Sequence, residues 1–535
     1  MTQLSDGLGR SRLRAGRVPA GGFARAGWSG ALGGLALHRW GVVVGLSGCA
    51  GLALRIWAYR SAIGVPTSDD GVVGLMALHA MRGQFTTFFW GQAYGGSQEA
   101  LLTVPVFWLF GPSWLALRIV PIMLTAVAAV LVWRVGRRTI GEPAATIAGA
   151  LFWIWPPFAI YKLTHQNGFY ASDVVYAALL LLLALRVVER PDRVRVGLLG
   201  LVFGLAFWQT SQVVPLAAGV LVWTIGKRPK ALRQLWVAVP LAALGALPWI
   251  VYNARHHWQS LFVMSQGGGT YIERLRIFFS PLVPMTLGLR ATWTQQVILP
   301  HLLTDAVYAA LLCAFAYGGY RALRRDASLI YLVALMFPFI YAISRWTYAD
   351  TEPRYLTALI PVLALLLAQP ARRLPVAIAL LACACALSVV NLQRMNAVAL
   401  LPRTYPPANR NLSPLVSTLD RLGIDRVYAG YEIAYLLDFA TKERIIAVMN
   451  KSPLVYAHGQ ATPRPRPGFI RWPAYDRVVR GAPHAFVFYE QEIPASTVVP
   501  QLRRDGYHAY TAGLFVVYVP RSITLRAVPG RNEDR

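Results

Sequence analysis

The run WGVVVGLSGCAGLALRIWA at residues 40–58 decides the fold class of this chain. It has the length of a membrane-crossing helix, since about 20 predominantly apolar residues cover the hydrocarbon core of a bilayer. Similar runs recur up to about residue 392, and the chain of 535 residues is 56% hydrophobic and only 14% charged. We therefore predict a mostly α fold, a polytopic membrane helix bundle with a small C-terminal α/β domain.

The lengths of the apolar runs predict about 11 spans. They lie near residues 40–58, 114–132, 144–160, 170–187, 196–209, 212–225, 234–251, 302–320, 328–344, 354–369 and 374–392. The apolar segment 98–110 is too short to cross a bilayer and is predicted to form a helix at the membrane surface. Together these segments define a predicted transmembrane domain over residues 40–392.

Lys and Arg gather in alternate loops, as the positive-inside rule predicts for cytoplasmic segments. Loops 134–143, 186–195, 226–233, 321–325 and 371–373 hold 16 of them in 36 residues, whereas loops 59–113, 161–170, 209–212, 252–301 and 345–354 hold 9 in about 130 residues. The net charge of +28 thus reflects cytoplasmic loops, and nucleic acid is not predicted as a partner. We expect residues 1–39 to be a flexible, basic cytoplasmic tail and residues 59–113 to be a large external loop.

From about residue 393 the apolar runs give way to short alternating segments with Pro, Gly and charges, which are typical of a soluble domain. Helices near 413–422 and 496–503 alternate with strands near 426–429, 484–489 and 514–519, and residues 457–473 are predicted to form a loop. This alternation predicts a soluble extracytoplasmic α/β domain over residues 393–535.

The sequence SDDG at residues 68–71 follows the first span. Carboxylates at a membrane boundary are costly and often functional. Adjacent carboxylates can divide their roles, one as a general base and one as a metal-binding or orienting neighbour. Asp69 and Asp70 are therefore the candidate catalytic residues. The alternative interpretation, which is compatible with the first, is that Ser68 or Asp69 caps a helix over residues 71–81.

Two further polar segments lie in predicted external loops. GQAYGGSQE at residues 91–99 contributes Tyr94, Gln98 and Glu99 as candidate substrate-binding residues, although a glycine-rich turn before a helix explains the same pattern. The second external loop contributes His165 and Asn167. A single histidine among polar neighbours is more often a hydrogen-bonding residue than a metal ligand. A divalent metal is possible, but the sequence assigns it no ligands.

The segment RWTYADTEPRY at residues 345–355 is the densest polar cluster between spans. Its candidate substrate-binding residues are Arg345, Asp350, Glu352, Arg354 and Tyr355. Arg354 begins a predicted span on the outer side, where a guanidinium can bind a phosphate through two parallel hydrogen bonds. The alternative is an arginine that reaches the lipid headgroups or pairs with Asp350 or Glu352.

These motifs in this order resemble the GT-C superfamily of membrane glycosyltransferases. The features are an acidic pair after the first span, a long first external loop with GQAYGGSQEALL at residues 91–102, an Arg-Tyr pair opening the late span EPRYLTALIPVLALLLA at residues 352–368, and a C-terminal domain. The sequence is most similar to the family 39 group of protein O-mannosyltransferases and the bacterial aminoarabinose transferase. The resemblance covers roughly residues 40–392.

The resemblance implies inverting transfer of a sugar from a polyprenyl-phosphate carrier to an acceptor hydroxyl on the outer face of the cell membrane. Its partners would be the lipid-linked donor, a glycan, lipid or protein acceptor of the cell envelope, and membrane lipids. The first loop of that family usually reads Asp-Glu, with the Asp as base. Asp69 matches the base and Asp70 replaces the Glu, so either aspartate can be the base here. Arg354 and Tyr355 match the position that meets the carrier phosphate.

Two other classes of protein remain open at this stage. A transporter or flippase would carry ionisable groups near the bilayer midplane and often an internal repeat, whereas here the acids gather at one face and no repeat is obvious. A non-catalytic envelope-assembly protein would use the C-terminal domain to bind a partner. Loss of transfer on mutating the two aspartates in a folded protein distinguishes the enzyme from both.

Overall fold

Helix α1 (Ala26–Arg60) contains the first predicted span. The computed structural model describes residues 26–265, 267–323, 325–402, 404, 406–407, 411–449, 454–457, 460–463, 470–496 and 498–521. The chain divides into two compact units, residues 1–46 and 47–535, and all elements after α1 belong to the second. The predicted flexible tail is corrected in its second part, because residues 26–39 are helical, and residues 1–25 lie outside the described residues. Ala and Leu, which are strong helix formers, extend α1 in this direction.

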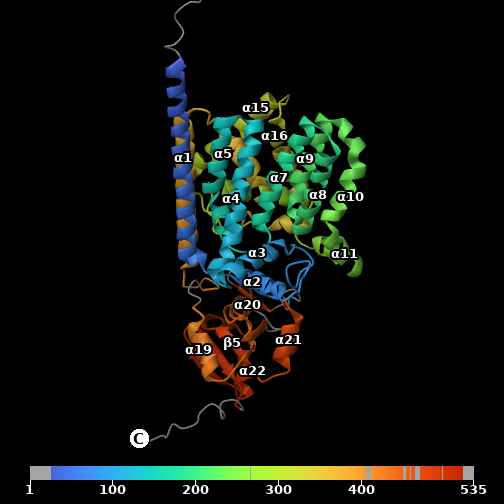
Figure 1. Cartoon of the computed structure of the whole chain (residues 1–535). Coiled ribbons are helices and arrows are strands. Elements are labelled where there is room, and N and C mark those ends of the chain that lie inside the picture. The colour runs from blue at the N-terminus through green and yellow to red at the C-terminus, as the bar shows by residue number, and fades with distance from the viewer. Residues whose placement is uncertain are drawn as a thin grey trace, which may run out of the picture. The chain divides into compact units, whose positions relative to one another are not determined.

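The membrane part of the second unit is helical (Figure 1). Its α-helices after the first loop are α4 (Trp114–Thr139), α5 (Glu142–Ile154), α6 (Pro157–Lys162), α7 (Tyr170–Glu189), α8 (Arg193–Gln209), α9 (Val214–Lys227), α10 (Leu235–Gly245), α11 (Leu247–Arg255), α12 (Gln259–Ser265), α13 (Tyr271–Ile277), α14 (Val283–Leu287), α15 (His301–Ala322), α16 (Ser328–Tyr341), α17 (Ile360–Ala368) and α18 (Leu374–Ala399). Short 3-10 or π segments are η2 (Ser211–Val213), η3 (Pro229–Gln234), η4 (Phe278–Leu282), η5 (Arg345–Tyr348) and η6 (Arg354–Leu359). Each predicted span coincides with one helix or with two consecutive ones.

Five helices of the described residues are long and apolar enough to cross a bilayer. They are Trp40–Arg60 within α1, α4, α7, α15 and α18, and a sixth results if Pro229–Gly245 and Leu247–Arg255, which bend by 65° at their junction, form one span. Other apolar helices, such as α5 and α16, are shorter. These helices are those of a multi-pass membrane protein, while the prediction of about 11 crossings and their orientation stay predictions.

Helix α4 illustrates how the bundle meets its surroundings. Met123, Val127 and Val130 form one exposed stripe, whereas Ala128 and Leu131 are buried against other helices. An exposed apolar stripe at helical spacing is unfavourable in water but matches a helix whose outer face contacts acyl chains. The outer face of α4 is therefore suited to lipid.

A mixed five-stranded sheet organises the C-terminal region. Its strand order is β2 (Ile446–Met449), β1 (Arg426–Ala429), β5 (Ala485–Tyr489), β7 (Phe515–Val519) and β6 (His508–Ala512). β1 is parallel to β2 and β5, and β7 is antiparallel to β5 and β6. The accompanying helices are α19 (Ser413–Arg421), α20 (Tyr431–Ala440), α21 (Pro473–Arg480), η8 (Glu490–Ala495) and α22 (Val499–Arg504). Helices and strands alternate as predicted, while the placement of this region outside the membrane stays a prediction.

Two strands of the C-terminal region stand apart from this sheet. β3 (Leu454–Ala457) and β4 (Gln460–Pro463) form a separate antiparallel hairpin. The predicted loop over residues 457–473 is therefore wrong at residue 457, at residues 460–463 and at residue 473, which begins α21 (Pro473–Arg480). Pro463 does not prevent the strand, because β4 is an edge strand of a two-stranded hairpin, where a missing N–H is tolerated.

Helix α2 (Ser68–Met81) links the membrane helices to this sheet (Figure 1). α2 packs against α20, and glycines allow the close approach. A Cβ atom on Gly71 would lie 2.4 Å from the carbonyl oxygen of Tyr435, and one on Gly74 would lie 2.5 Å from the ring of Phe439. Apolar residues of α2, α3 (Gln98–Phe110) and the sheet share one buried cluster. The orientation of α2 is therefore set from both sides.

Candidate active site

A cavity of about 680 Å³ lies where the start of α2, the membrane helices and the C-terminal region meet. This volume is in the range of about 300–1,000 Å³ that is typical of small-molecule sites. The lining residues are Asp69, Phe89, Gln92, Tyr94, Gly95, Lys162, Asn167, Phe169, Tyr170, Phe207, Thr210, Ser211, Gln212, Val214, Pro215, Ile340, Tyr341, Ile343, Ser344, Trp346, Thr347, Arg354, Tyr355, Tyr431 and Arg471. Of the predicted site residues, Asp69, Tyr94, Asn167, Arg354 and Tyr355 face this cavity.

Asp69 presents its carboxylate to the cavity from the first turn of α2, and its side chain is 42% exposed. Oδ1 accepts a hydrogen bond of 2.6 Å from the hydroxyl of Tyr431. It also lies 3.8 Å from Nη2 of Arg471. No described residue hydrogen-bonds Oδ2, so this oxygen is available to a substrate.

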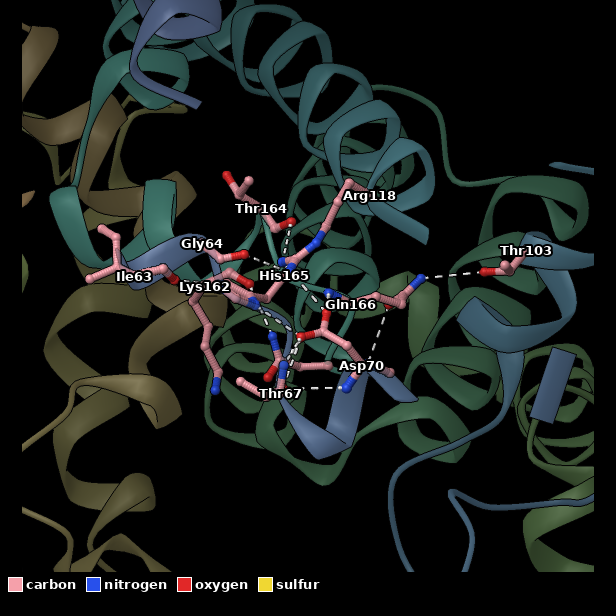
Figure 2. A network of polar contacts seen from close by, with 12 residues as sticks. Ile63, Gly64, Thr67, Asp70, Thr103, Arg118, Lys162, Thr164, His165 and Gln166 are labelled. Carbon is pink, nitrogen blue, oxygen red and sulfur yellow. Dashed lines mark hydrogen bonds and ion pairs between the residues drawn. The ribbon is translucent and has the colours of Figure 1, made fainter. Parts of the chain in front are cut away.

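Asp70 is completely buried and does not line the cavity. Its carboxylate lies in a network of polar contacts (Figure 2). It forms a capping box with Thr67, whose hydroxyl accepts from the Asp70 amide at 3.3 Å and whose amide donates to Asp70 Oδ2 at 2.8 Å. The N-cap of α2 is therefore Thr67 and not Ser68 or Asp69. The amide of Gln166 donates to Oδ1 at 2.7 Å, and Nδ1 of His165 lies 3.0 Å from Oδ2.

Arg118 of α4 completes the network around Asp70. Its Nη1 lies 3.5 Å from Asp70 Oδ1 and donates to the carbonyl oxygen of Thr164, while Nη2 donates to that of Gly64 (Figure 2). Burial by itself would raise the pKa of Asp70, but Arg118 and His165 hold it well below its usual range. Asp70 is thus an ionised structural group that fixes the loop between α6 and α7 to the start of α2, and it does not face the cavity.

The glycine-rich segment is a turn that presents Tyr94. Gly95 has a φ of +72°, and the amide of Gly96 donates to the carbonyl oxygen of Gln209 at 2.8 Å. A Cβ atom on Gly96 would lie 2.5 Å from the Gln209 side chain, so this contact requires glycine. The turn thus directs the Tyr94 ring into the cavity, where it lies 6.1 Å from the ring of Trp346.

Gln98 and Glu99 lie behind the cavity wall. The Gln98 side chain donates to the carbonyl oxygen of Leu205 at 2.9 Å and accepts from the Tyr176 hydroxyl. Glu99 is buried and accepts two hydrogen bonds from Ser172, from its amide at 2.8 Å and its hydroxyl at 2.7 Å. Both residues join α3 to the neighbouring membrane helices.

Positive charge lines the side of the cavity formed by η6 and α6. The Nε of Arg354 lies 3.6 Å from Oε2 of Glu352, and no described residue hydrogen-bonds the guanidinium. The ammonium of Lys162 lies 4.8 Å from the centre of the Tyr170 ring. Burial would raise the pKa of Glu352, but Lys162 and Arg354 bring it below its ordinary value. An ionised Glu352 therefore keeps both cations beside the cavity and leaves donors of Arg354 available.

Of the other predicted residues of these loops, only Asn167 lines the cavity. His165 is buried, with Nε2 2.8 Å from the carbonyl oxygen of Ile63, and therefore supports Asp70. Asn167 faces the cavity and donates to the carbonyl oxygen of Lys162 at 3.3 Å. Neither Arg345 nor Asp350 lines the cavity. Within the described residues, no group of three or more His, Cys, Asp or Glu side chains is placed to hold a metal ion.

Two residues of this cavity come from the C-terminal region, where the sequence predicts no chemistry. Tyr431 begins α20 and Arg471 precedes α21. The sequence hints at a role for Arg471 only weakly, as a charged residue between the apolar Ile470 and Trp472. The contact arises because Trp472 stacks on Trp90 of the first loop, with ring centres 4.5 Å apart.

The sequence and the fold of this chain are similar to those of known proteins. Residues 100–252 match the family model described as dolichyl-phosphate-mannose-protein mannosyltransferase. The fold is similar to two crystal structures of ArnT from Cupriavidus metallidurans, one bound to undecaprenyl phosphate and one in the apo state. Their TM-scores are 0.55 and 0.56. In each case the sequence identity is 16%, and the similarity covers 95% of this chain and 100% of the ArnT chain. No curated protein sequence matches.

The apolar helices are those of an integral membrane protein, and its cavity is lined by charged residues. The match of residues 100–252 to the mannosyltransferase family model indicates a membrane glycosyltransferase of the GT-C superfamily, and the fold is similar to that of ArnT. The resemblance seen in the sequence is thereby confirmed, and the enzyme is favoured over a transporter or an assembly protein.

Proposed function

We propose that this enzyme transfers a sugar from a polyprenyl-phosphate carrier to an acceptor hydroxyl of the cell envelope, on the outer face of the membrane. The observation that carries the proposal is that one cavity is lined by Asp69 and also by Arg354 and Lys162. A carboxylate can remove the proton of the acceptor, and the cations can stabilise a phosphate leaving group. The family match and the undecaprenyl phosphate bound to ArnT support a lipid-phosphate donor.

In the proposed step, Oδ2 of Asp69 takes the proton of the acceptor hydroxyl. The acceptor oxygen attacks the anomeric carbon from the face opposite the phosphate and forms the new glycosidic bond. The bond between the anomeric carbon and the phosphate oxygen breaks, and its electron pair stays on the carrier phosphate. Attack opposite the leaving group inverts the anomeric configuration.

Arg354 is the preferred ligand of the carrier phosphate in this proposal. Its guanidinium has no hydrogen-bond partner among the described residues, whereas that of Arg471 donates to Tyr431. Arg354 also begins η6, directly before the apolar helix α17, where the polar end of a lipid carrier could meet it. Lys162 adds a second charge beside Tyr170. A fork of donors suits a phosphate better than a point charge does.

A deletion strain tests this function without knowledge of the sugar. We expect its membranes to accumulate a polyprenyl-phosphate-linked sugar, detected by mass spectrometry of chloroform–methanol extracts, and its envelope to lose one sugar. Addition of the purified enzyme to these membranes should consume the accumulated lipid. A deletion strain with unchanged lipid-linked sugars and unchanged envelope glycans would contradict the proposal.

The proposed orientation makes a separate prediction. In a variant whose four cysteines, Cys49, Cys313, Cys383 and Cys385, are replaced by alanine, Gln84→Cys and Asp505→Cys should react with an impermeant maleimide in intact cells. Both positions are exposed in the structure. The exposed control Lys230→Cys, in a predicted cytoplasmic loop, should react only after permeabilisation. The reverse pattern would place Asp69 on the inner face.

A further inference from the structure

We infer that Tyr431 and Arg471 of the C-terminal region are positioning residues that orient the carboxylate of Asp69 for proton transfer. This inference rests on the proposed function, because it takes Asp69 as the base. It gives the C-terminal region a direct part in the reaction, whereas the family model matches only residues 100–252 of the membrane part.

The direction of the hydrogen bonds is determined by their chemistry. Nε and Nη2 of Arg471 lie 3.0 Å and 2.9 Å from the hydroxyl oxygen of Tyr431. A guanidinium can only donate, so this oxygen accepts both bonds. The phenol proton is therefore directed to Oδ1 of Asp69, 2.6 Å away. Burial and the Asp69 charge raise the pKa of Tyr431 well above its ordinary value, so the phenol keeps this proton.

The chain of hydrogen bonds from Arg471 through Tyr431 to Asp69, here called the relay, gives the two oxygens of Asp69 different tasks. Oδ1 is held by the Tyr431 hydroxyl, which stops rotation of the carboxylate. Oδ2 accepts no hydrogen bond from any described residue, and Asp69 lines the cavity. A base must lie within hydrogen-bond reach of the proton it removes, and a displacement of about 1 Å can cost about 100-fold in rate. Orienting Asp69 is thus a catalytic requirement that Asp69 cannot meet alone.

Arg471 is itself rigidly held, with a side chain only 7% exposed. Its guanidinium lies 5.0 Å from the ring centre of Phe89 and 5.1 Å from that of Tyr431. With the Gln92 amide oxygen turned towards it, as a donor-only guanidinium requires, Nη1 and Nη2 donate to that oxygen at 2.6 Å and 3.2 Å. The Arg471 amide donates to the Tyr435 hydroxyl at 2.5 Å. These contacts suit a structural donor better than a ligand for a mobile phosphate.

The pairing of α2 with α20 keeps the relay in register. The hydroxyl of Ser68 donates to the carbonyl oxygen of Tyr431 at 2.5 Å, next to the catalytic carboxylate. At the far end of α2, His79 and the Tyr475 hydroxyl each lie 2.7 Å from Oε1 of Glu443. α2 is therefore tied to the C-terminal region at both ends, so Asp69 and Tyr431 cannot separate without breaking this interface.

Three variants test the relay in the assay with deletion-strain membranes. Tyr431→Phe keeps the ring and removes the donor, and Arg471→Gln removes the charge that orients it. We expect each to lower the maximal transfer rate about 10- to 100-fold, as for a misplaced catalytic group. Arg471→Lys should recover part of the rate, because it restores one charged donor. The affinity of these variants for undecaprenyl phosphate should stay within about twofold of the parent value, since the relay is not proposed to bind the carrier phosphate.

Tyr489→Phe is the matched control. It removes another buried tyrosine hydroxyl, which donates at 3.1 Å to the carbonyl oxygen of Glu432, the residue after Tyr431 in α20. The control should transfer normally. Because both relay variants act through Asp69, their double variant should be no slower than the slower single variant.

The transfer rates of these variants distinguish a failure of the relay from a failure of the proposed function. Normal rates in Tyr431→Phe and Arg471→Gln, beside an inactive Asp69→Asn, would overturn the relay alone. Normal transfer by Asp69→Asn would overturn the assignment of the base and the relay with it. Equal losses of rate in Tyr431→Phe and in the Tyr489→Phe control would show general disturbance of α20 and would also reject the relay.

Discussion

Asp69→Asn should abolish sugar transfer while leaving the protein folded and able to bind undecaprenyl phosphate. Asn keeps the shape of Asp and can still accept the Tyr431 hydrogen bond, but it cannot take the proton of the acceptor. Loss of a general base typically lowers a rate by about two to four orders of magnitude. The carboxylate is 42% exposed, so little stability depends on it. The measurement is consumption of the accumulated lipid-linked sugar by purified variants in deletion-strain membranes.

Asp70→Asn is the internal control for this experiment, and it should show the opposite phenotype. Asp70 accepts bonds from Thr67 and Gln166 and faces the buried Arg118, so an amide there places donors against donors. Breaking a buried ion pair typically costs about 3–5 kcal/mol. We expect a strongly lowered melting temperature, with transfer per folded molecule within about tenfold of the parent. Inactivity of Asp70→Asn together with activity of Asp69→Asn would reverse the two roles.

Arg354→Ala should weaken binding of undecaprenyl phosphate by about 10- to 100-fold, because a hydrogen bond to a charged group contributes about 1.5–3 kcal/mol. The affinity of Arg354→Lys for undecaprenyl phosphate should lie between those of the parent and Arg354→Ala. Lys restores the charge but not the planar fork that binds two phosphate oxygens. Fluorescence titration of the purified protein with undecaprenyl phosphate measures this affinity.

Arg255→Ala is the matched control for Arg354. Arg255 is an exposed arginine at the end of α11, in another predicted external loop, and it does not line the cavity. Its loss should leave the affinity unchanged. If Arg354→Ala binds as tightly as Arg255→Ala, Arg354 serves only to anchor the chain at the lipid headgroups and Lys162 becomes the remaining candidate for the phosphate.

The helices of the membrane part follow from local properties of the sequence. Each predicted span coincides with helical segments because apolar backbone in a bilayer must satisfy its own hydrogen bonds. Interruptions of a helix within a predicted span are harder to predict. α5 ends at Ile154 and α6 begins at Pro157, because Pro156 and Pro157 lack the N–H groups that a continuous helix needs. The prediction of one span over residues 144–160 overlooked this effect.

The residues of the site are predicted from the sequence only in part. The sequence by itself pointed to an acidic pair after the first span and to Arg354 at the start of a late one, because charges are rare and costly beside a membrane. Only the tertiary structure distinguished Asp69, in the cavity, from Asp70, in a buried capping network. Only the tertiary structure brought Tyr431 and Arg471 to Asp69, across more than 360 residues of sequence. Hydropathy and local spacing record which segments enter the membrane, but contacts between distant segments depend on packing, such as that of α2 on α20, which no local pattern encodes.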